Sequence, residues 1–321
     1  MKLNMKNIKF MYYMQGILRE LVPKYFFRRQ LQSKLDSISY YQDAQYIHNR
    51  VSYYNQAAPF DVDQQDETTG YLPILAKDFK INEQIESSVY YHDLYRYLVY
   101  FSGLMKFHYW PGDKTVSPSL PNIVKSRPVQ NNRNSVLMKL DRVRHFNFIN
   151  DPFPYDVKKD MAVWRGAGWQ THRITMLKNL YGHPRCDAGA NKPVKNNPYK
   201  VSFMPIREQL QYKFILCPEG NDVATNLKWV MSSNSVAVMS RPKHETWFME
   251  GQLEAGTHYI EVNDDYSDVP EKIDFYLRHP EQAREISRNA NRYVQQFSDH
   301  RREDLIALMV LKKYFNDSRQ L

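Results

Sequence analysis

The chain has 321 residues and a formal net charge of +9, from 44 Lys and Arg against 35 Asp and Glu. With 42% hydrophobic and 25% charged residues, a globular protein is expected, and collagen-like, mucin-like and disordered chains are excluded. Two cysteines, Cys186 and Cys217, are too few for a disulfide scaffold and lack the neighbours of a zinc site. No apolar run reaches the roughly 20 residues of a membrane span, and no signal-peptide pattern is found, so a cytoplasmic protein is expected. The excess positive charge indicates an acidic partner: nucleic acid, an anionic membrane surface, or a phosphorylated or nucleotide substrate.

Residues 1–34 form a predicted basic arm. They hold eight Lys and Arg and one acid, Glu20, so the arm carries +7 and the remaining chain only +2 (9 − 7). A three- and four-residue spacing of apolar side chains predicts an amphipathic helix, interrupted near Pro23; these are Met11, Met14, Leu18, Leu21 and Tyr25. The stripe fits either packing on the protein's own core or docking on an anionic membrane. Phe26 and Phe27 beside Arg28 and Arg29 favour the membrane.

The middle of the chain predicts a first α/β layer. Residues 42–80 are polar and irregular, which indicates loops with short elements. Residues 89–107 are rich in Tyr, Leu and Phe and predict a helix followed by a strand. Two β-prone runs follow at 122–125 and 135–138.

After Asp160 strands alternate clearly with helices. Strands are predicted at 161–164, 212–217, 235–239 and 258–262; helices are predicted at 171–181, 222–231, 268–277, 280–297 and 302–315. This alternation predicts a parallel sheet with right-handed crossovers. Ligands of such sheets bind beyond the carboxyl ends of the strands.

Two loops at those carboxyl ends offer the chemistry of a phosphate site. Walker A, G-x-G-x-x-G, H-E-x-x-H and G-x-S-x-G motifs are absent, which removes most ATPases, dinucleotide dehydrogenases, zinc proteases and serine hydrolases. In the first loop, Arg165 stands beside Gly166 and Gly168, a cation with two sites of close backbone approach. The second loop, 219–226, is predicted to open a helix with its positive end towards a diphosphate. Glycine after a strand is also ordinary turn chemistry, but its recurrence on two βα units favours binding.

The longer runs around these loops resemble a known family. Trp164-Arg165-Gly166, 212–229, 231–235, 245–251 and His258-Tyr259 are similar to the CAP10-like glycosyltransferases, family GT90. The runs 125–128 and 139–145 resemble its bacterial branch, the lipopolysaccharide or lipooligosaccharide core glycosyltransferases. The resemblance covers about residues 90–315, and the basic arm is similar too.

The resemblance implies an α/β fold of GT-B type, with two Rossmann-like domains facing a central cleft and C-terminal helices. The acceptor-side domain is expected at 35–155, and the nucleotide-sugar domain with the C-terminal helices at 156–321. The implied reaction is an inverting transfer of glucose or galactose from UDP-glucose or UDP-galactose to the inner-core saccharide of lipopolysaccharide, a heptose. No metal and no cofactor are expected. Together with the arm, this implies a cytoplasmic enzyme that is peripheral on the inner face of the cytoplasmic membrane.

The resemblance also suggests roles for single residues. Asp113, which matches by its order along the chain the base of the eukaryotic protein O-glucosyltransferases, is the expected base, with Asp141 as the alternative. The expected donor-binding residues are Arg165, Gly166, Gly168, Glu219, Gly220, Asn221, Asp222, Ala224, Thr225, Asn226, Lys228 and Trp247. Lys125 and Arg127 are expected on the acceptor or phosphate side. Asn226 departs from the eukaryotic branch, which has an arginine there, so Lys228, Lys125 or Arg127 would have to supply that charge. Trp247 and Phe248 would flank the uracil ring, although a buried aromatic pair is just as ordinary in a core.

Two functions of other classes remain open at this point. One is a nucleic-acid or polyanion binder without catalysis. The absence of RRM, KH, zinc-finger and helix-turn-helix signatures argues against this function. The other is a carbohydrate-binding protein that keeps the GT-B shell without turnover.

Overall fold

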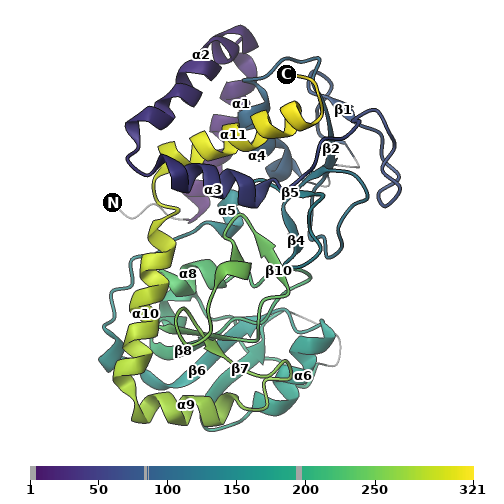
Figure 1. Ribbon diagram of the computed structural model, residues 1–321. Helices are drawn as coiled ribbons and strands as arrows, with labels where there is room; N and C mark the ends of the chain where they lie inside the picture. Colours follow the sequence, from purple (N-terminus) through teal and green to yellow (C-terminus); the bar gives the residue numbers. More distant parts are fainter. Residues whose placement is uncertain (1–4, 83–84, 86, 193–196) are drawn as a thin grey trace. The chain divides into compact units, whose positions relative to one another are not determined.

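The computed structural model describes residues 5–82, 85, 87–192 and 197–321, with side chains from residue 9 onward (Figure 1). Lys2 and the side chain of Lys6, both counted in the basic arm, lie outside this description. The chain divides into two compact units: unit 1 contains the residues up to Arg144, 244–248 and 297–321, and unit 2 contains 145–243 and 249–296. This division differs from the expected boundary at 155/156. Residues 244–248 and the last helix belong to unit 1, because their side chains are buried there.

Unit 1 combines helices with a small mixed sheet. Its helices are α1 (Met5–Leu21), α2 (Lys24–Asp36), the 3-10 helix η1 (Ser37–Tyr40), α3 (Ala44–Tyr54), α4 (Ser88–Leu98) and α11 (His300–Asp317), while α5 (Arg142–His145) ends at the boundary with unit 2. The sheet has the order β1-β2-β3-β5, in which β1 (Ile74–Leu75) is antiparallel and β2 (Lys106–Trp110), β3 (Asn122–Val124) and β5 (Ser135–Leu137) are parallel. A separate antiparallel pair joins β4 (Ser126–Pro128) and β10 (His244–Thr246).

Local chemistry explains where the helices of unit 1 begin. The Ser87 side chain accepts a hydrogen bond from the backbone N–H of Val89 and caps α4. Asp299 caps α11 by accepting from the backbone N–H groups of Arg301 and Arg302. Pro23 separates α1 from α2, as predicted, because proline cannot continue the first helix but suits the start of the second.

Unit 2 is a parallel α/β sheet. Its strands are β6 (Lys159–Gly166), β7 (Cys186–Ala190), β8 (Tyr212–Leu216), β9 (Val236–Met239) and β11 (Ile260–Glu261), in the order β11-β9-β8-β6-β7. Its helices are α6 (Thr171–Leu180), α7 (Ile206–Gln209), α8 (Leu227–Met231), α9 (Val269–Arg278), α10 (Pro280–Gln295) and the 3-10 helices η3 (Tyr155–Val157) and η4 (Glu250–Gln252). Side chains of α6, α9 and α10 cover the sheet face that carries Trp164 and Phe214. Strands buried on both faces read as apolar runs, which explains why β8 and β9 were recognisable in the sequence.

The mixed α/β class with parallel sheets is therefore confirmed. The GT-B arrangement, in which two domains face a central cleft, stays a prediction. The helix predicted at 222–231 is wrong in its first half, because α8 begins only at Leu227. The preceding loop closes on itself instead: Gly220 N–H donates to the Val223 carbonyl at 3.2 Å, and Asn226 Nδ2 donates to the Leu216 carbonyl at 2.9 Å. In the described part of the chain, no helix has the length and apolarity of a membrane span.

Candidate functional site

The two Gly-containing loops flank the topological switch point of the unit 2 sheet. In chain order the connection from β6 leads to β7 on one side of β6, and the next connection returns to β8 on its other side. The chain leaves the carboxyl ends of β6 and β8 in the loops 167–170 and 217–226, which diverge to opposite sides of one crevice position. Open α/β sheets bind their ligands at this position. The topology of the sheet therefore indicates the same two loops that the sequence analysis indicated as a ligand site.

Arg173, in the first turn of α6, joins these loops. Its Nε donates to the Glu219 carbonyl at 2.7 Å, its Nη2 to the Pro218 carbonyl at 3.1 Å and its Nη1 to the Ala167 carbonyl at 3.2 Å. No ion pair of Arg173 is found within the described residues. Burial lowers the pKa of Arg173 to about 10, so the group still carries its charge at neutral pH.

The sequence reasoning missed Arg173, although a signal was present. A cation in the first turn of a helix opposes the helix dipole, and α6 carries Arg173 there with no acidic residue in its first turn. An anion bound at the same place would offset the repulsion between this cation and the helix dipole, and would explain why the cation stands there. His172 lies beside it, with Nε2 2.8 Å from the Glu219 carbonyl oxygen.

Close packing explains why glycines stand at positions 166 and 168. A Cβ on Gly166 would lie 2.5 Å from the Trp164 indole, and one on Gly168 would lie 2.8 Å from the Ala190 Cβ. In contrast, a Cβ on Gly220 would make ordinary contacts at 3.4 Å or more. Gly166 and Gly168 therefore fix the path of the loop against the sheet.

The second loop exposes only some of the predicted donor-binding residues. Five of them reach the surface at least in part, namely Glu219, Gly220, Asn221, Thr225 and Asn226. Asp222 and Ala224 are buried, at 3% exposure each. Asn226 holds the loop to the end of β8 through its bond to Leu216, which is a structural role for a residue expected to bind the donor.

Arg165 is directed away from the loops. It lies near the carboxyl end of β6, but its guanidinium donates to the backbone carbonyl and to Oδ1 of Asp187, both at 2.6 Å. Asp187 lies near the amino end of β7 and also accepts from the Tyr212 hydroxyl at 2.6 Å. The prediction that Arg165 forks onto a phosphate is not supported by this geometry, because a side chain 7% exposed and ion-paired on the sheet face is not at the crevice.

Lys228 and Arg127 were predicted at the phosphates, and the structure buries both. Lys228 is 0% exposed and ion-paired with Glu250 within unit 2. Arg127 is also 0% exposed, and its Nε donates to Glu245 at 2.7 Å within unit 1. Burial of these charges is tolerated because each has a carboxylate partner. They hold α8 to η4 and β4 to β10.

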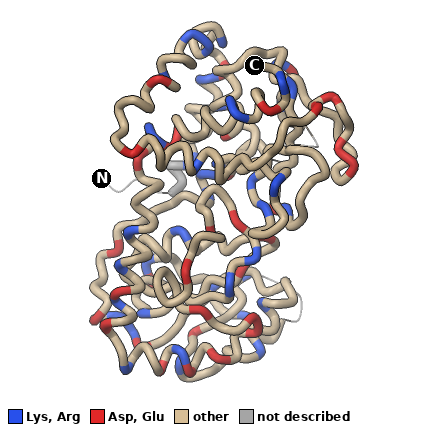
Figure 2. Tube along the Cα trace, in the orientation of Figure 1, with Lys and Arg blue, Asp and Glu red and all other residues tan. Residues whose placement is uncertain are grey.

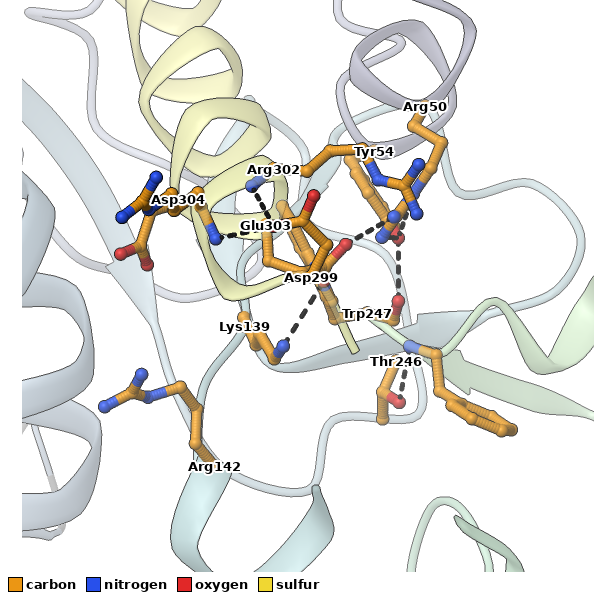
Figure 3. A network of polar contacts seen from close by, with 12 residues as sticks. Arg50, Tyr54, Lys139, Arg142, Thr246, Trp247, Asp299, Arg302, Glu303 and Asp304 are labelled. Carbon is orange, nitrogen blue, oxygen red and sulfur yellow. Dashed lines mark hydrogen bonds and ion pairs between the residues drawn. The ribbon is translucent and has the colours of Figure 1, made fainter. Parts of the chain in front are cut away.

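Trp247 belongs to a buried polar network in unit 1, as Figure 3 shows. Its indole has no exposed surface, is stacked on Tyr54 at 3.8 Å between ring centroids, and donates from Nε1 to Glu303 at 2.6 Å. Glu303 also pairs with Arg50 and Lys139. Burial by itself would raise the pKa of Glu303, but the Lys139 and Arg50 charges hold it below its ordinary value. Trp247 and Phe248, both 0% exposed, are thus core residues, and their predicted place beside the uracil ring is corrected.

In unit 1, the candidate base lies at the carboxyl edge of the parallel strands. Asp113 follows β2 through a turn in which Gly112 has a φ of 94°, a conformation that favours glycine. Lys125 follows β3 directly, is 1% exposed and forms an ion pair with Asp113, which is 28% exposed. Asp141 and Arg144 follow β5, and Arg144 Nη2 lies 3.8 Å from Asp113.

The two aspartates differ in their surroundings. Arg144 Nε lies 2.8 Å from Asp141 Oδ2, and the Asp141 side chain is 8% exposed. Burial raises the pKa of Asp141 to about 6, although Arg144 and Lys125 oppose this shift. Asp113 is the more accessible carboxylate, so it is the better candidate for contact with an acceptor hydroxyl. Among the described residues no three His, Cys, Asp or Glu side chains are grouped as metal ligands, and the metal-free reaction stays a prediction.

Comparisons with known proteins show the family of the chain. Residues 137–314 match the family described as Glycosyl transferase family 90. The chain is 46% identical over 275 residues to O-glucosyltransferase LpsA of Dichelobacter nodosus, which covers 84% of this chain and 83% of that protein. A shorter stretch of 105 residues is 32% identical to Uncharacterized protein 179R of Invertebrate iridescent virus 6, covering 30% of this chain and 9% of that protein. The family match contains both loops, Arg173 and Asp141, and it begins after Asp113.

Proposed function

Since the chain belongs to glycosyltransferase family 90, we propose that it transfers a hexose from a UDP-sugar to a saccharide of lipopolysaccharide. Glucose is the first choice, because the relative from Dichelobacter nodosus is named an O-glucosyltransferase, and galactose is the second. The acceptor proposed from the sequence is a heptose of the inner core. The protein would act in the cytoplasm, peripheral on the inner face of the cytoplasmic membrane.

The observation that carries this proposal is the position of Arg173. Its guanidinium bonds three backbone carbonyls from the two loops at the switch point. A diphosphate at this point would receive the charge of Arg173, which has no ion pair within the described residues, and backbone N–H groups of the exposed part of loop 217–226. These groups would stabilise the negative charge that develops on the departing UDP, which is what a transfer without a metal requires.

Asp113 is the proposed base of an inverting reaction. Its carboxylate would take the proton from the acceptor hydroxyl while the oxygen forms a bond to the anomeric carbon. The bond from that carbon to the UDP oxygen breaks on the opposite face, and UDP leaves with the electron pair. The positive charges nearest to the Asp113 carboxylate are Lys125, which is ion-paired with it, and Arg144, with Nη2 at 3.8 Å. Asp141 remains the alternative base, favoured by its pKa of about 6 but disfavoured by its burial.

A nucleic-acid binder is the weaker alternative. The arm accounts for +7 of the net charge of +9. Outside the arm, Figure 2 shows positive and negative residues interspersed along both units. Such a distribution does not form the continuous basic stripe that binds a nucleic-acid backbone.

The proposal is tested by following UDP release from a panel of UDP-sugars, with and without lipopolysaccharide truncated in its core. Acceptor-dependent release from UDP-glucose or UDP-galactose is expected. The absence of turnover with every UDP-sugar and acceptor, together with salt-sensitive binding of RNA, would favour the alternative instead.

A further inference from the structure

The first helix presents an unbroken apolar face to solvent. Seven large apolar side chains of α1 and the residue after it are between 40% and 75% exposed: Phe10, Met11, Met14, Ile17, Leu18, Leu21 and Val22. Because consecutive helix residues are about 100° apart, these seven fall within an arc of about 140°. A stripe of this width is what an amphipathic helix buries against a partner.

The opposite face of α1 fixes its orientation in unit 1. The Tyr12 hydroxyl donates to the Val89 carbonyl at 3.1 Å, and the Tyr13 ring meets His92 edge to face at 5.9 Å. Gly16 allows this close packing, because a Cβ there would lie 2.6 Å from the His92 ring. The helix therefore packs on α4 with its polar-aromatic face. This orientation leaves the apolar stripe outward, so the stripe is not packed on the protein's own core.

Cations accompany the apolar stripe. From residue 9 to residue 34 there are six Lys and Arg and one acid, Glu20. Four of these cations belong to α2 (Figures 1 and 2). Arg28 and Arg29 are exposed, although Arg28 Nε also donates to the Phe101 carbonyl at 3.0 Å, whereas Lys24 and Lys34 are half-buried. Tyr25 and Phe26, at the start of α2, are 59% and 55% exposed.

We propose that α1 and α2 dock on a bilayer that contains anionic phospholipid, with the α1 stripe in the acyl boundary and the exposed α2 cations, Arg28 and Arg29, at the headgroups. The apolar stripe supplies burial and the cations supply attraction to the anionic surface, the two contributions that hold an interfacial helix. A second copy of this chain is a poorer partner, because pairing would bring two arms of like charge together. The inference rests on the proposed peripheral location and not on the transfer reaction.

The test is sedimentation of the full chain with vesicles of phosphatidylglycerol and phosphatidylcholine in equal parts, compared with phosphatidylcholine alone. The double variant Leu18→Ser/Leu21→Ser removes the centre of the stripe without a change of charge. Its control, Gln15→Ser/Gln30→Ser, changes one exposed polar residue of α1 and one of α2. The wild type and the control are expected to bind the anionic vesicles in a salt-sensitive manner. The Leu variant is expected to bind roughly 100-fold more weakly, from the lost burial of two leucines.

Three results would overturn the inference. The first is a wild type that stays in solution with anionic vesicles, and the second is a Leu variant that binds as the wild type does. The third is a dimer that the Leu variant converts to a monomer, which would make a second copy the occupant of the stripe. Hexose transfer to a detergent-dispersed acceptor, measured on the same samples, separates failure of docking from failure of the enzyme function.

Discussion

Arg173→Gln is the substitution that best separates phosphate binding from loop structure. If Arg173 binds the diphosphate, the variant loses two charge-assisted hydrogen bonds, each worth about 1.5–3 kcal/mol. The lower limit of this sum, about 3 kcal/mol, corresponds to a roughly 100-fold weaker Kd for UDP. The guanidinium also bonds three carbonyls of the two loops, so a loss of loop order is a second possible effect of the same substitution.

Titration calorimetry with UDP and with uridine distinguishes the two effects. A lost phosphate contact weakens UDP binding and leaves uridine binding nearly unchanged, whereas a disordered loop weakens both. Arg165→Gln is the matched control, because it makes the same substitution in the same unit at an arginine that is paired with Asp187. Equal UDP affinity in wild type and Arg173→Gln would refute the assignment of Arg173 to the phosphate site.

The remaining predictions concern three residues. Asp113→Asn is expected to lower kcat about 10²–10⁴-fold without weakening UDP binding, since only proton abstraction is removed; transfer at the wild-type rate would place the base elsewhere. Arg165→Gln is expected to cost about 1–3 kcal/mol of unfolding free energy in urea denaturation, and it should not change UDP affinity; the reverse pattern would restore Arg165 to the donor site. Asp141 has a folded pKa of about 6, above its unfolded value of 3.8, so its ionisation costs the folded state stability as pH rises from about 4 to about 6. The free energy of unfolding of Asp141→Asn, relative to that of the wild type, should therefore rise by about 2 kcal/mol between pH 4.5 and pH 7.5. Parallel pH profiles of the two proteins would contradict this.

Much of the secondary structure of unit 2 could be predicted because it depends on patterns within short stretches of the sequence. Strands buried on both faces leave apolar runs such as 212–216, and the loops after them carry the polar and glycine residues that parallel sheets place at their carboxyl ends. The order β7-β6-β8, which makes the switch point, could not be read in the same way. It depends on which strands pair over long distances, and β7 itself was missed because Cys186–Ala190 contains small residues and no β-branched ones.

Burial of charged and aromatic side chains was the main source of error at the site. Lys228 and Arg127 look like phosphate ligands in a sequence, but each finds a carboxylate partner far along the chain, Glu250 and Glu245 respectively. Trp247 reads equally well as a base platform, and only the stacking on Tyr54 shows that it lies in a core. Pairings at such separations follow from tertiary packing, which spacing in a sequence does not report.

The most direct test of the central claim is mass spectrometry of core-truncated lipopolysaccharide after incubation with UDP-glucose or UDP-galactose. The expected result is a gain of one hexose with the wild type and a much slower gain with Asp113→Asn and Arg173→Gln. If the wild type adds no hexose from either donor and does not bind UDP, the proposed transfer at the β6/β8 switch point is contradicted.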